Sequence, residues 1–205
     1  MGFYDRHILP KVLHLACGMK PIRYQRRKVV PEASGRVLEI GIGSGLNLPY
    51  YDPAKVEKLW GLEPAAEIRQ MAEKAAVGAP FPIEFIGLPG ESIPLDDASI
   101  DTVVTTYTLC TIPDAVATLR EMRRVLKPGG KLLFSEHGKA PDAEVKRWQD
   151  RLDTVWGHIA GGCHLNRDIP ALLREGGFAV EKLDTMYIPG PRPLSFNYWG
   201  SATPA

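Results

Sequence analysis

The segment VLEIGIGSGLNLP, Val37 to Pro49, places a strand-like apolar run directly before a cluster of glycines. Gly41, Gly43 and Gly45 follow the acidic residue Glu39. Glycines at this spacing let the chain turn sharply at the carboxyl end of a strand, and they let backbone N–H groups approach a ligand closely. The segment therefore predicts a strand followed at once by a loop for close ligand contact.

Outward from this segment, apolar runs alternate with helical patterns through most of the chain. The alternation predicts an α/β fold with a three-layer, doubly wound, Rossmann-like sheet that is mostly parallel. A Pro/Gly-rich bend at 190–193, followed by aromatic residues, predicts a C-terminal antiparallel hairpin. The predicted strands are Arg36–Ile40, Val56–Glu63, Ile83–Leu88, Ile100–Thr106 and Lys131–Glu136, and the helical patterns include Ala65–Val77 and Asp114–Leu126.

Length and composition favour one soluble domain. The 205 residues are 44% hydrophobic and 24% charged, and the net charge of +1 excludes nucleic-acid binding driven by overall phosphate attraction, so no nucleic-acid partner is expected. Cys17, Cys110 and Cys163 lie far apart in the sequence, which predicts neither a disulfide framework nor a metal site and favours a reducing, cytoplasmic location. We find no apolar run long enough to span a membrane and no signal-peptide pattern.

The N-terminal 35 residues stand outside the alternation. Residues 4–19 predict a helix interrupted by Pro10. We interpret the following basic cluster first as a solvated linker, because runs of charge usually face water. Two alternatives are a lid over a cofactor and a weak contact with anionic lipid headgroups. The basic cluster consists of Lys20, Arg23, Arg26, Arg27 and Lys28.

The glycine loop and the next strand narrow the choice of cofactor. A dinucleotide loop would read GxGxxG, but here the third glycine comes one place early and Leu46 stands in its position. The carboxylate of Glu39 suits a cationic ligand and would repel a pyrophosphate. Glu63 ends the second strand, where doubly wound folds place an acid that binds a ribose diol. The alternative is that Glu63 only caps the helix that begins near Pro64.

Together with these features, later segments resemble the class I S-adenosylmethionine-dependent methyltransferases. These segments are PGESIPLDDASIDTVV (89–104), TTYTLCTIPD (105–114) and LREMRRVLKPGGKLLFSEH (119–137). The resemblance implies S-adenosylmethionine as the cofactor and a single domain over 1–205. Within it, 1–35 would be a lid, 36–137 the cofactor-binding core, and 138–205 the acceptor-side helices and hairpin. The implied cofactor contacts are Tyr4, Glu39, Gly41, Gly43, Gly45, Asn47, Glu63, Pro64, Gly90, Glu91, Thr106 and Tyr107, with Asp5 beside Tyr4 in the lid.

A narrower similarity concerns the acceptor. SEH at 135–137 and DTVWGHIAGGCHLNRD at 153–168 resemble a group that includes membrane-associated alkyl thiol methyltransferases. This implies a small or lipophilic acceptor with thiol sulfur favoured, without the hydrophobic anchor of the eukaryotic members. Some bacterial phospholipid N-methyltransferases share the core motifs, so headgroup methylation is the alternative. A non-catalytic nucleotide-binding module and an NAD oxidoreductase are the remaining hypotheses, and the oligomeric state is open.

The catalytic group is less evident than the cofactor loop. His137 follows the fifth strand at the carboxyl edge of the sheet and is the candidate general base, although it can equally orient a loop. Leu109, Trp156 and His164 are candidates for the acceptor pocket, with Trp148, Tyr107 and His158 as further members. We interpret Cys110 and Cys163 as small buried residues, because direct methyl transfer requires no covalent enzyme intermediate.

Overall fold

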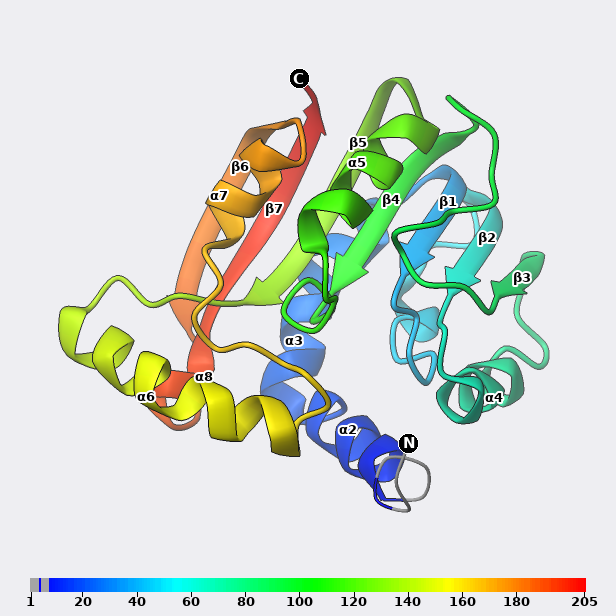
Figure 1. Cartoon of the computed structure of the whole chain (residues 1–205). Coiled ribbons are helices and arrows are strands. Elements are labelled where there is room, and N and C mark those ends of the chain that lie inside the picture. The colour runs from blue at the N-terminus through cyan, green and yellow to red at the C-terminus, as the bar shows by residue number, and fades with distance from the viewer. Residues whose placement is uncertain (1–3, 5–7) are drawn as a thin grey trace.

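A mixed sheet organises the chain in the computed structural model, which describes Tyr4 and residues 8–205. Within these residues the strand order is β3-β2-β1-β4-β5-β7-β6, with parallel pairing from β3 to β5 and β7 antiparallel to both β5 and β6 (Figure 1). This confirms the predicted Rossmann-like sheet and its terminal hairpin. The strands are β1 (Gly35–Ile40), β2 (Val56–Leu62), β3 (Ile83–Ile86), β4 (Ile100–Thr106), β5 (Leu126–His137), β6 (Phe178–Tyr187) and β7 (Phe196–Pro204).

Helices cover both faces of the sheet. In Figure 1, α5 and α7 lie in front of the strands and α3 lies behind them. Asp114 and Asp168 begin α5 and α7 by accepting hydrogen bonds from the N–H groups of Ala117 and Ala171. The helices are α2 (Leu9–Cys17), α3 (Lys20–Val29), α4 (Ala66–Ala75), α5 (Ala115–Val125), α6 (Ala143–Ile159), α7 (Ile169–Glu175) and α8 (Arg192–Ser195), with 3-10 turns at Val30–Glu32 and Leu48–Tyr50.

Side chains that point alternately to the two faces of the central strands form the two hydrophobic layers. Leu38 packs in a cluster with α5 and α7, while its neighbour Val37 packs in a second cluster with the end of α3. Successive side chains of a strand point to opposite faces, so a strand covered on both sides is apolar at successive positions. Glu39 shares the face of Val37 by the same alternation, which places this carboxylate on the side of α3.

The predicted strands differ from the observed ones at their ends. β2 ends at Leu62 and β3 at Ile86, shorter than predicted. β5 is longer than predicted because the Pro128–Gly130 turn is a bulge within it: Ile100 pairs with Leu126, and Thr102 pairs with Lys131. Gly129 has a φ of 78°, the left-handed conformation that such a bulge requires.

The N-terminal segment differs in part from the prediction. Pro10 lies in the first turn of α2, where the N–H that proline lacks would have no acceptor within the helix. The basic cluster is not a solvated linker: it lies on α3, where Gln25 and Arg26 are buried against the sheet. Asp5 lies outside the described residues.

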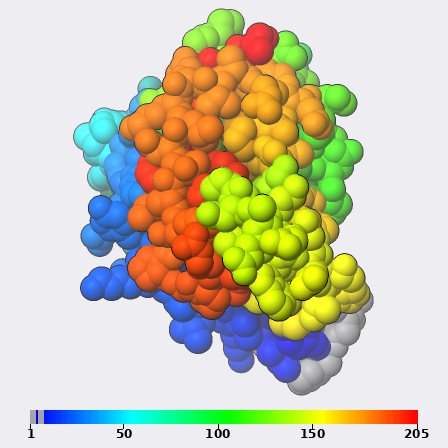
Figure 2. All heavy atoms as spheres, turned by 90° about the vertical axis from the view of Figure 1, so that its left-hand side faces the viewer, coloured from blue at the N-terminus to red at the C-terminus, as the bar shows by residue number. Residues whose placement is uncertain are grey.

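α2 and the end of α6 lie together at the carboxyl edge of the sheet. Tyr4 Oη donates a 2.8 Å hydrogen bond to the carbonyl of Ile159, and a Cβ at Gly161 would come within 3.0 Å of Leu9. Figures 1 and 2 both show the N-terminal helices next to α6. Within the described residues, no helix combines the length and the apolar character needed to cross a bilayer.

Candidate active site

The glycines after β1 have distinct structural roles. Gly41, Gly43 and Gly45 have φ values of 69°, 58° and 80°, in the left-handed region that glycine tolerates. A Cβ at Gly41 would lie 2.4 Å from the Thr108 side chain, and one at Gly45 would lie 3.3 Å from Cα of Ala72 in α4. A Cβ at Gly43 would have only the Gly41 carbonyl, 3.8 Å away, as a neighbour. Gly41 and Gly45 therefore allow close packing, while Gly43 leaves free space for a ligand.

Glu39 is held inside the protein by neutral donors. Its side chain is 1% exposed. Oε1 accepts a hydrogen bond from Asn47 Nδ2 at 2.8 Å, and Oε2 accepts one from Tyr51 Oη at 2.7 Å. Burial raises the pKa of Glu39 to about 7, although Tyr51, Arg26 and Asn47 favour its ionised form. Glu39 thus orients Asn47, and its own contact with the cofactor stays a prediction.

Arg26 completes this network from the other side of the site. Its Nη1 donates to Asn47 Oδ1 at 2.9 Å and to Thr106 Oγ1 at 2.5 Å, and its guanidinium lies 5.4 Å from the centre of the Tyr107 ring. Asn47 Nδ2 also donates to Thr106 Oγ1, at 2.9 Å. The predicted site residues Asn47, Thr106 and Tyr107 are therefore brought together around a buried guanidinium.

Arg26 is not among the site residues predicted from the sequence, because its charge placed it with the other cations of the basic cluster. A usable signal was present: Ile22, Gln25, Arg26 and Val29 have the i, i+3, i+4, i+7 spacing of one helix face. Arg26 Nε is buried and has no hydrogen-bond partner among the described residues. A buried guanidinium N–H without an acceptor is costly, so this atom marks a place for an anionic group.

The acidic residues after β2 and β3 lie at the same edge of the sheet. Glu63 is half-buried, and its Oε1 accepts a 3.0 Å hydrogen bond from the N–H of Ala65. Burial raises the pKa of Glu63 and outweighs the hydrogen bonds from the N–H groups of Ala65 and Gly43, which lower it. Glu91 Oε1 accepts from the N–H of Asp114 at 3.3 Å, at the start of α5. Pro64 is exposed, and Gly90 is packed against Thr118.

A second buried carboxylate fixes the loop after β4. Glu136 is fully buried and accepts hydrogen bonds from Thr105 Oγ1 at 2.8 Å and from the N–H of Thr108 at 2.9 Å. These bonds hold Tyr107 at a φ of 55°, an uncommon value for a residue with a side chain. Tyr107 Oη then donates to Asn197 Oδ1 on β7, at 2.5 Å. The sequence analysis overlooked Glu136, although it lies inside the SEH segment.

The predicted acceptor residues differ in their surroundings. Leu109 is fully buried in the larger core cluster, and Trp156 is half-buried with its indole N–H lacking a partner among the described residues. His164 Nδ1 lies 2.8 Å from Asp153 Oδ2. His158 is exposed on α6, where its Nδ1 lies 2.7 Å from the carbonyl of Thr154. Their contacts with an acceptor stay predictions.

His137 contacts a thiol. Its Nε2 lies 2.9 Å from Cys163 Sγ, and its ring stacks on Tyr107 with centroids 6.4 Å apart. Cys163 Sγ lies 3.6 Å from Cys110 Sγ, and this contact and burial together raise the pKa of Cys163 well above its usual range. Cys110 is buried as predicted, while Cys163 is half-buried. The role of His137 as a base stays a prediction.

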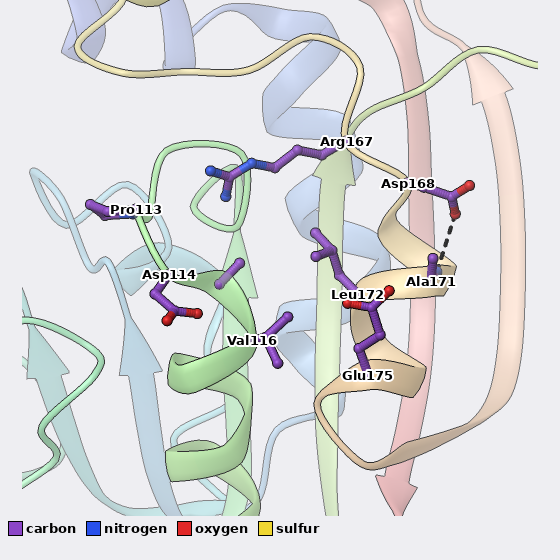
Figure 3. A pocket seen from close by; sticks show the side chains of 9 residues that line it. Pro113, Asp114, Val116, Arg167, Asp168, Ala171, Leu172 and Glu175 are labelled. Atoms are coloured by element: carbon purple, nitrogen blue, oxygen red, sulfur yellow. Dashed lines mark hydrogen bonds between the residues drawn. The ribbon is translucent and has the colours of Figure 1, made fainter.

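A separate cleft lies on the flank of the site. A cavity of about 320 Å³ between the start of α5 and α7 is lined by Asp114, Val116, Arg167, Leu172 and others (Figure 3). The Arg167 side chain extends toward the loop before α5, where its Nη1 donates to the carbonyls of Leu109 and Ile112. None of the sequence-predicted site residues lines this cavity, so we do not assign it to the cofactor.

The fold and the site together define a class of protein: an α/β protein of Rossmann-like topology with a glycine loop and buried polar side chains at the carboxyl edge of its parallel strands. A family model described as a methyltransferase domain matches residues 38–134. The chain is similar to human thiol S-methyltransferase TMT1B, with 36% identity over 84% of this chain and 71% of that protein. It spans 62% of the length of rat TMT1B, at 35% identity.

A structural relative agrees with the sequence relatives on the fold. A Leishmania major S-adenosylmethionine-dependent methyltransferase superposes with a TM-score of 0.71 over 98% of this chain and 80% of its own, at 19% identity. This chain belongs to the class I S-adenosylmethionine-dependent methyltransferase family. The predictions of an enzyme and of S-adenosylmethionine as its cosubstrate are thereby confirmed.

The residues of the site fit this cosubstrate. The unpartnered N–H of Arg26 suits its carboxylate, the space at Gly43 leaves room for a ligand against the loop, and the half-buried Glu63 can accept hydrogen bonds from a ribose. A chain that bound no anionic group here would leave the Arg26 donor unsatisfied. The N–H of Arg26 does not distinguish S-adenosylmethionine from a dinucleotide, because a phosphate would also satisfy it. The spacing of the glycines is the stronger argument against a dinucleotide.

Proposed function

We propose that this chain methylates the sulfur of a small or lipophilic thiol. The observation that carries the proposal is the 36% identity to human thiol S-methyltransferase TMT1B across 84% of this chain, which includes the acceptor side as well as the cofactor loop. The contact of His137 with Cys163 adds local support, since both residues lie in the segments that first pointed to a thiol acceptor.

The cofactor supplies an electrophilic methyl group on a positively charged sulfur. The residues that would hold and orient it are Arg26, for its carboxylate, the glycine loop from Gly41 to Gly45, and Glu63, for its ribose. Positioning two reactants as a near-attack pair can lower a barrier by about 7–11 kcal/mol, whereas one general base contributes about 10²- to 10⁴-fold. The buried network that fixes Asn47 and Tyr107 serves positioning.

A thiol acceptor needs little help from a general base. A free thiol has a pKa of about 8.5, so a few per cent is already thiolate at neutral pH. Amines and phenols would need a positioned group to take their proton. In this chain Glu39 and Glu136 are fully engaged by hydrogen bonds, which leaves neither carboxylate directed at an acceptor.

The test is a panel of acceptors. Purified protein is incubated with S-adenosylmethionine and, separately, with alkyl and aryl thiols, amines, phenols and phospholipids, and each product is analysed by mass spectrometry for the gain of one methyl group. We expect gain on thiols and formation of S-adenosylhomocysteine in equal amount. Methylation of amines or lipids alone would refute the thiol assignment while leaving the methyltransferase class intact.

A second candidate function, methylation of a lipid headgroup, is favoured by an exposed apolar surface on two helices. These side chains are 39–75% exposed and follow the i, i+4, i+7, i+11 spacing of a helix face. Exposed cations at Lys11, Lys20, Arg147 and Arg151 flank them. The apolar surface consists of Ile8, Val12, Leu15 and Met19 along α2, and Trp148, Leu152, Val155 and Ile159 on α6.

Such a surface is suited to the boundary between lipid headgroups and acyl chains. It would bring the site to an acceptor that stays in the membrane. A similar bacterial protein, phosphatidylethanolamine N-methyltransferase of Cereibacter sphaeroides, is 29% identical over 60% of this chain. Co-sedimentation with vesicles of phosphatidylglycerol and phosphatidylethanolamine tests the surface. Loss of binding in Leu15→Glu and Val155→Glu, with unchanged binding in Val77→Glu, would support it, and equal partitioning of all variants would exclude it.

A further inference from the structure

Three metal-binding side chains from distant parts of the sequence meet beside the site. Cys110 follows β4, His137 ends β5, and Cys163 lies between α6 and α7. Cys163 Sγ is 3.6 Å from Cys110 Sγ and 2.9 Å from His137 Nε2, and the three ligand atoms all lie within 4.8 Å of one another. The spacing of these residues in the sequence gave no sign of such a group.

Contacts that do not involve the thiols fix the position of the cluster. The N–H of His164 donates to the carbonyl of Cys110 at 2.8 Å, so the two cysteine-bearing segments are joined by backbone. Arg167 donates to the carbonyls of Leu109 and Ile112, which anchors the same two segments again. His137 pairs with Asn197 in the sheet. Contacts outside the three side chains therefore bring the ligands next to one another.

Two of the three ligand separations lie near those of a tetrahedral zinc site, and the third, between Cys110 Sγ and His137 Nε2, is within 4.8 Å. With Zn–S bonds of about 2.3 Å, two sulfur ligands of one ion lie roughly 3.8 Å apart, and the observed separation of Cys110 Sγ and Cys163 Sγ is 3.6 Å. The 2.9 Å contact of His137 with Cys163 is a hydrogen bond. It must lengthen by less than about 1 Å to admit an ion. Gly161 and Gly162, at φ values of 64° and 88°, precede Cys163 and permit that adjustment.

We propose that Cys110, His137 and Cys163 bind one zinc ion, and that its fourth coordination position takes the thiol acceptor as a thiolate. This inference rests on the proposed thiol methylation. Three protein ligands with an open position are typical of catalytic zinc, whereas structural zinc has four. Cys110 is buried but His137 and Cys163 are half-buried, so one side of the cluster remains accessible. The ring of His137 stacks on Tyr107, which follows Thr106 in the Arg26 network.

The chemistry balances without a further reagent. Zinc binding releases one proton from each of the two cysteine thiols, and the acceptor thiol releases a third proton when it coordinates. In the transfer, a sulfur lone pair of the acceptor forms the new S–CH₃ bond while the sulfonium S–CH₃ bond breaks and its electron pair stays on S-adenosylhomocysteine. The neutral thioether product coordinates zinc more weakly than a thiolate and leaves. His137 is then a ligand through Nε2, and no general base is needed.

The experiment measures metal binding before activity. Protein freed of metal under phosphine reductant is loaded with Zn²⁺, passed through gel filtration, and analysed for zinc per chain. We expect about one zinc in the wild type and in Cys17→Ser, with retention lowered more than about tenfold in Cys110→Ser and Cys163→Ser. Thermal shifts with S-adenosylhomocysteine verify that each variant is folded. Zinc retention that is absent in the wild type, or unchanged in Cys163→Ser, overturns the proposal.

Cobalt reports on the open position. Co²⁺ in place of zinc should give the visible bands of a tetrahedral thiolate site, and ethanethiol should shift them. A shift with ethanethiol, without methylation of any thiol in the acceptor panel, would retain the metal site and refute the thiol function. Methylation at equal rates by metal-free and zinc-loaded protein would retain the function and overturn the inference. A count of free thiols gives a last outcome. If two thiols are lost without uptake of metal, Cys110 and Cys163 form a disulfide, and the inference is overturned.

Discussion

The two sides of the sheet's carboxyl edge are constructed differently. On the cofactor side, Arg26, Asn47, Glu39 and Thr106 form a buried network in which nearly every polar atom has a partner. On the acceptor side, thiols and an imidazole contact one another beneath half-exposed segments, next to an apolar surface on α2 and α6. The first arrangement suits the proposed binding of one ligand in one orientation, and the second suits the proposed access of acceptors of varied shape.

Removing the buried guanidinium is the strongest test of this contrast. Arg26→Met deletes the bonds to Asn47 and Thr106 and leaves the Glu39 carboxylate without its balancing charge. We expect the free energy of unfolding to fall by about 3–5 kcal/mol, and affinity for S-adenosylmethionine to fall with it. Urea denaturation and calorimetric titration measure the two. In Arg27→Met, where an exposed guanidinium 5.5 Å from the Tyr50 ring is lost, the cost should stay below about 1 kcal/mol. Equal effects of both changes would remove Arg26 from the site.

The pH dependence of stability tests the burial of Glu39. Its pKa is raised to about 7 in the folded chain from an ordinary 4.5, so the folded state binds the proton more tightly than the unfolded state. The stabilising contribution is complete below pH 4.5 and is lost as pH rises through about 7, with a total of about 3 kcal/mol. Glu39→Gln should remove the part of the decline due to Glu39, while Glu63 and Glu136, whose pKa values burial also raises, contribute equally in both chains. Urea titrations from pH 4.5 to 8.5 measure both chains, and parallel curves would contradict the assignment.

A smaller effect is expected at the ribose position. Glu63→Ala should weaken S-adenosylmethionine binding by about 1–3 kcal/mol, the cost of losing hydrogen bonds to a charged partner. Glu57→Ala, at the opposite end of β2 and exposed, is the matched control and should leave affinity unchanged. If calorimetry gives equal affinities for wild type and Glu63→Ala, the ribose assignment is wrong. Glu63 then only caps the helix that follows it, through the N–H of Ala65.

The same contrast explains how much the sequence could predict. The glycine loop, Glu63 and the alternating strands are local patterns, because residues near one another in the sequence produce the geometry. The mostly parallel sheet with its terminal hairpin followed from them, and the cofactor class followed from the resemblance of these and later segments to methyltransferases; the order of the strands was not predicted. Cys110, His137 and Cys163 come from three segments and meet only through the packing of the α6–α7 connection, which no local spacing records. Arg26 was hidden for a different reason: its charge suggested solvent, while its place on the apolar face of α3 placed it inside.

The insertion of β7 between β5 and β6 has a consequence for biosynthesis. Asn197 on β7 pairs with His137 and receives the hydrogen bond of Tyr107, so a strand that follows β6 in the sequence supports this edge of the sheet. During translation the glycine loop, the first five strands and α6 all leave the ribosome before this residue does. The region around His137 and Tyr107 is therefore completed later in synthesis than the glycine loop beside it.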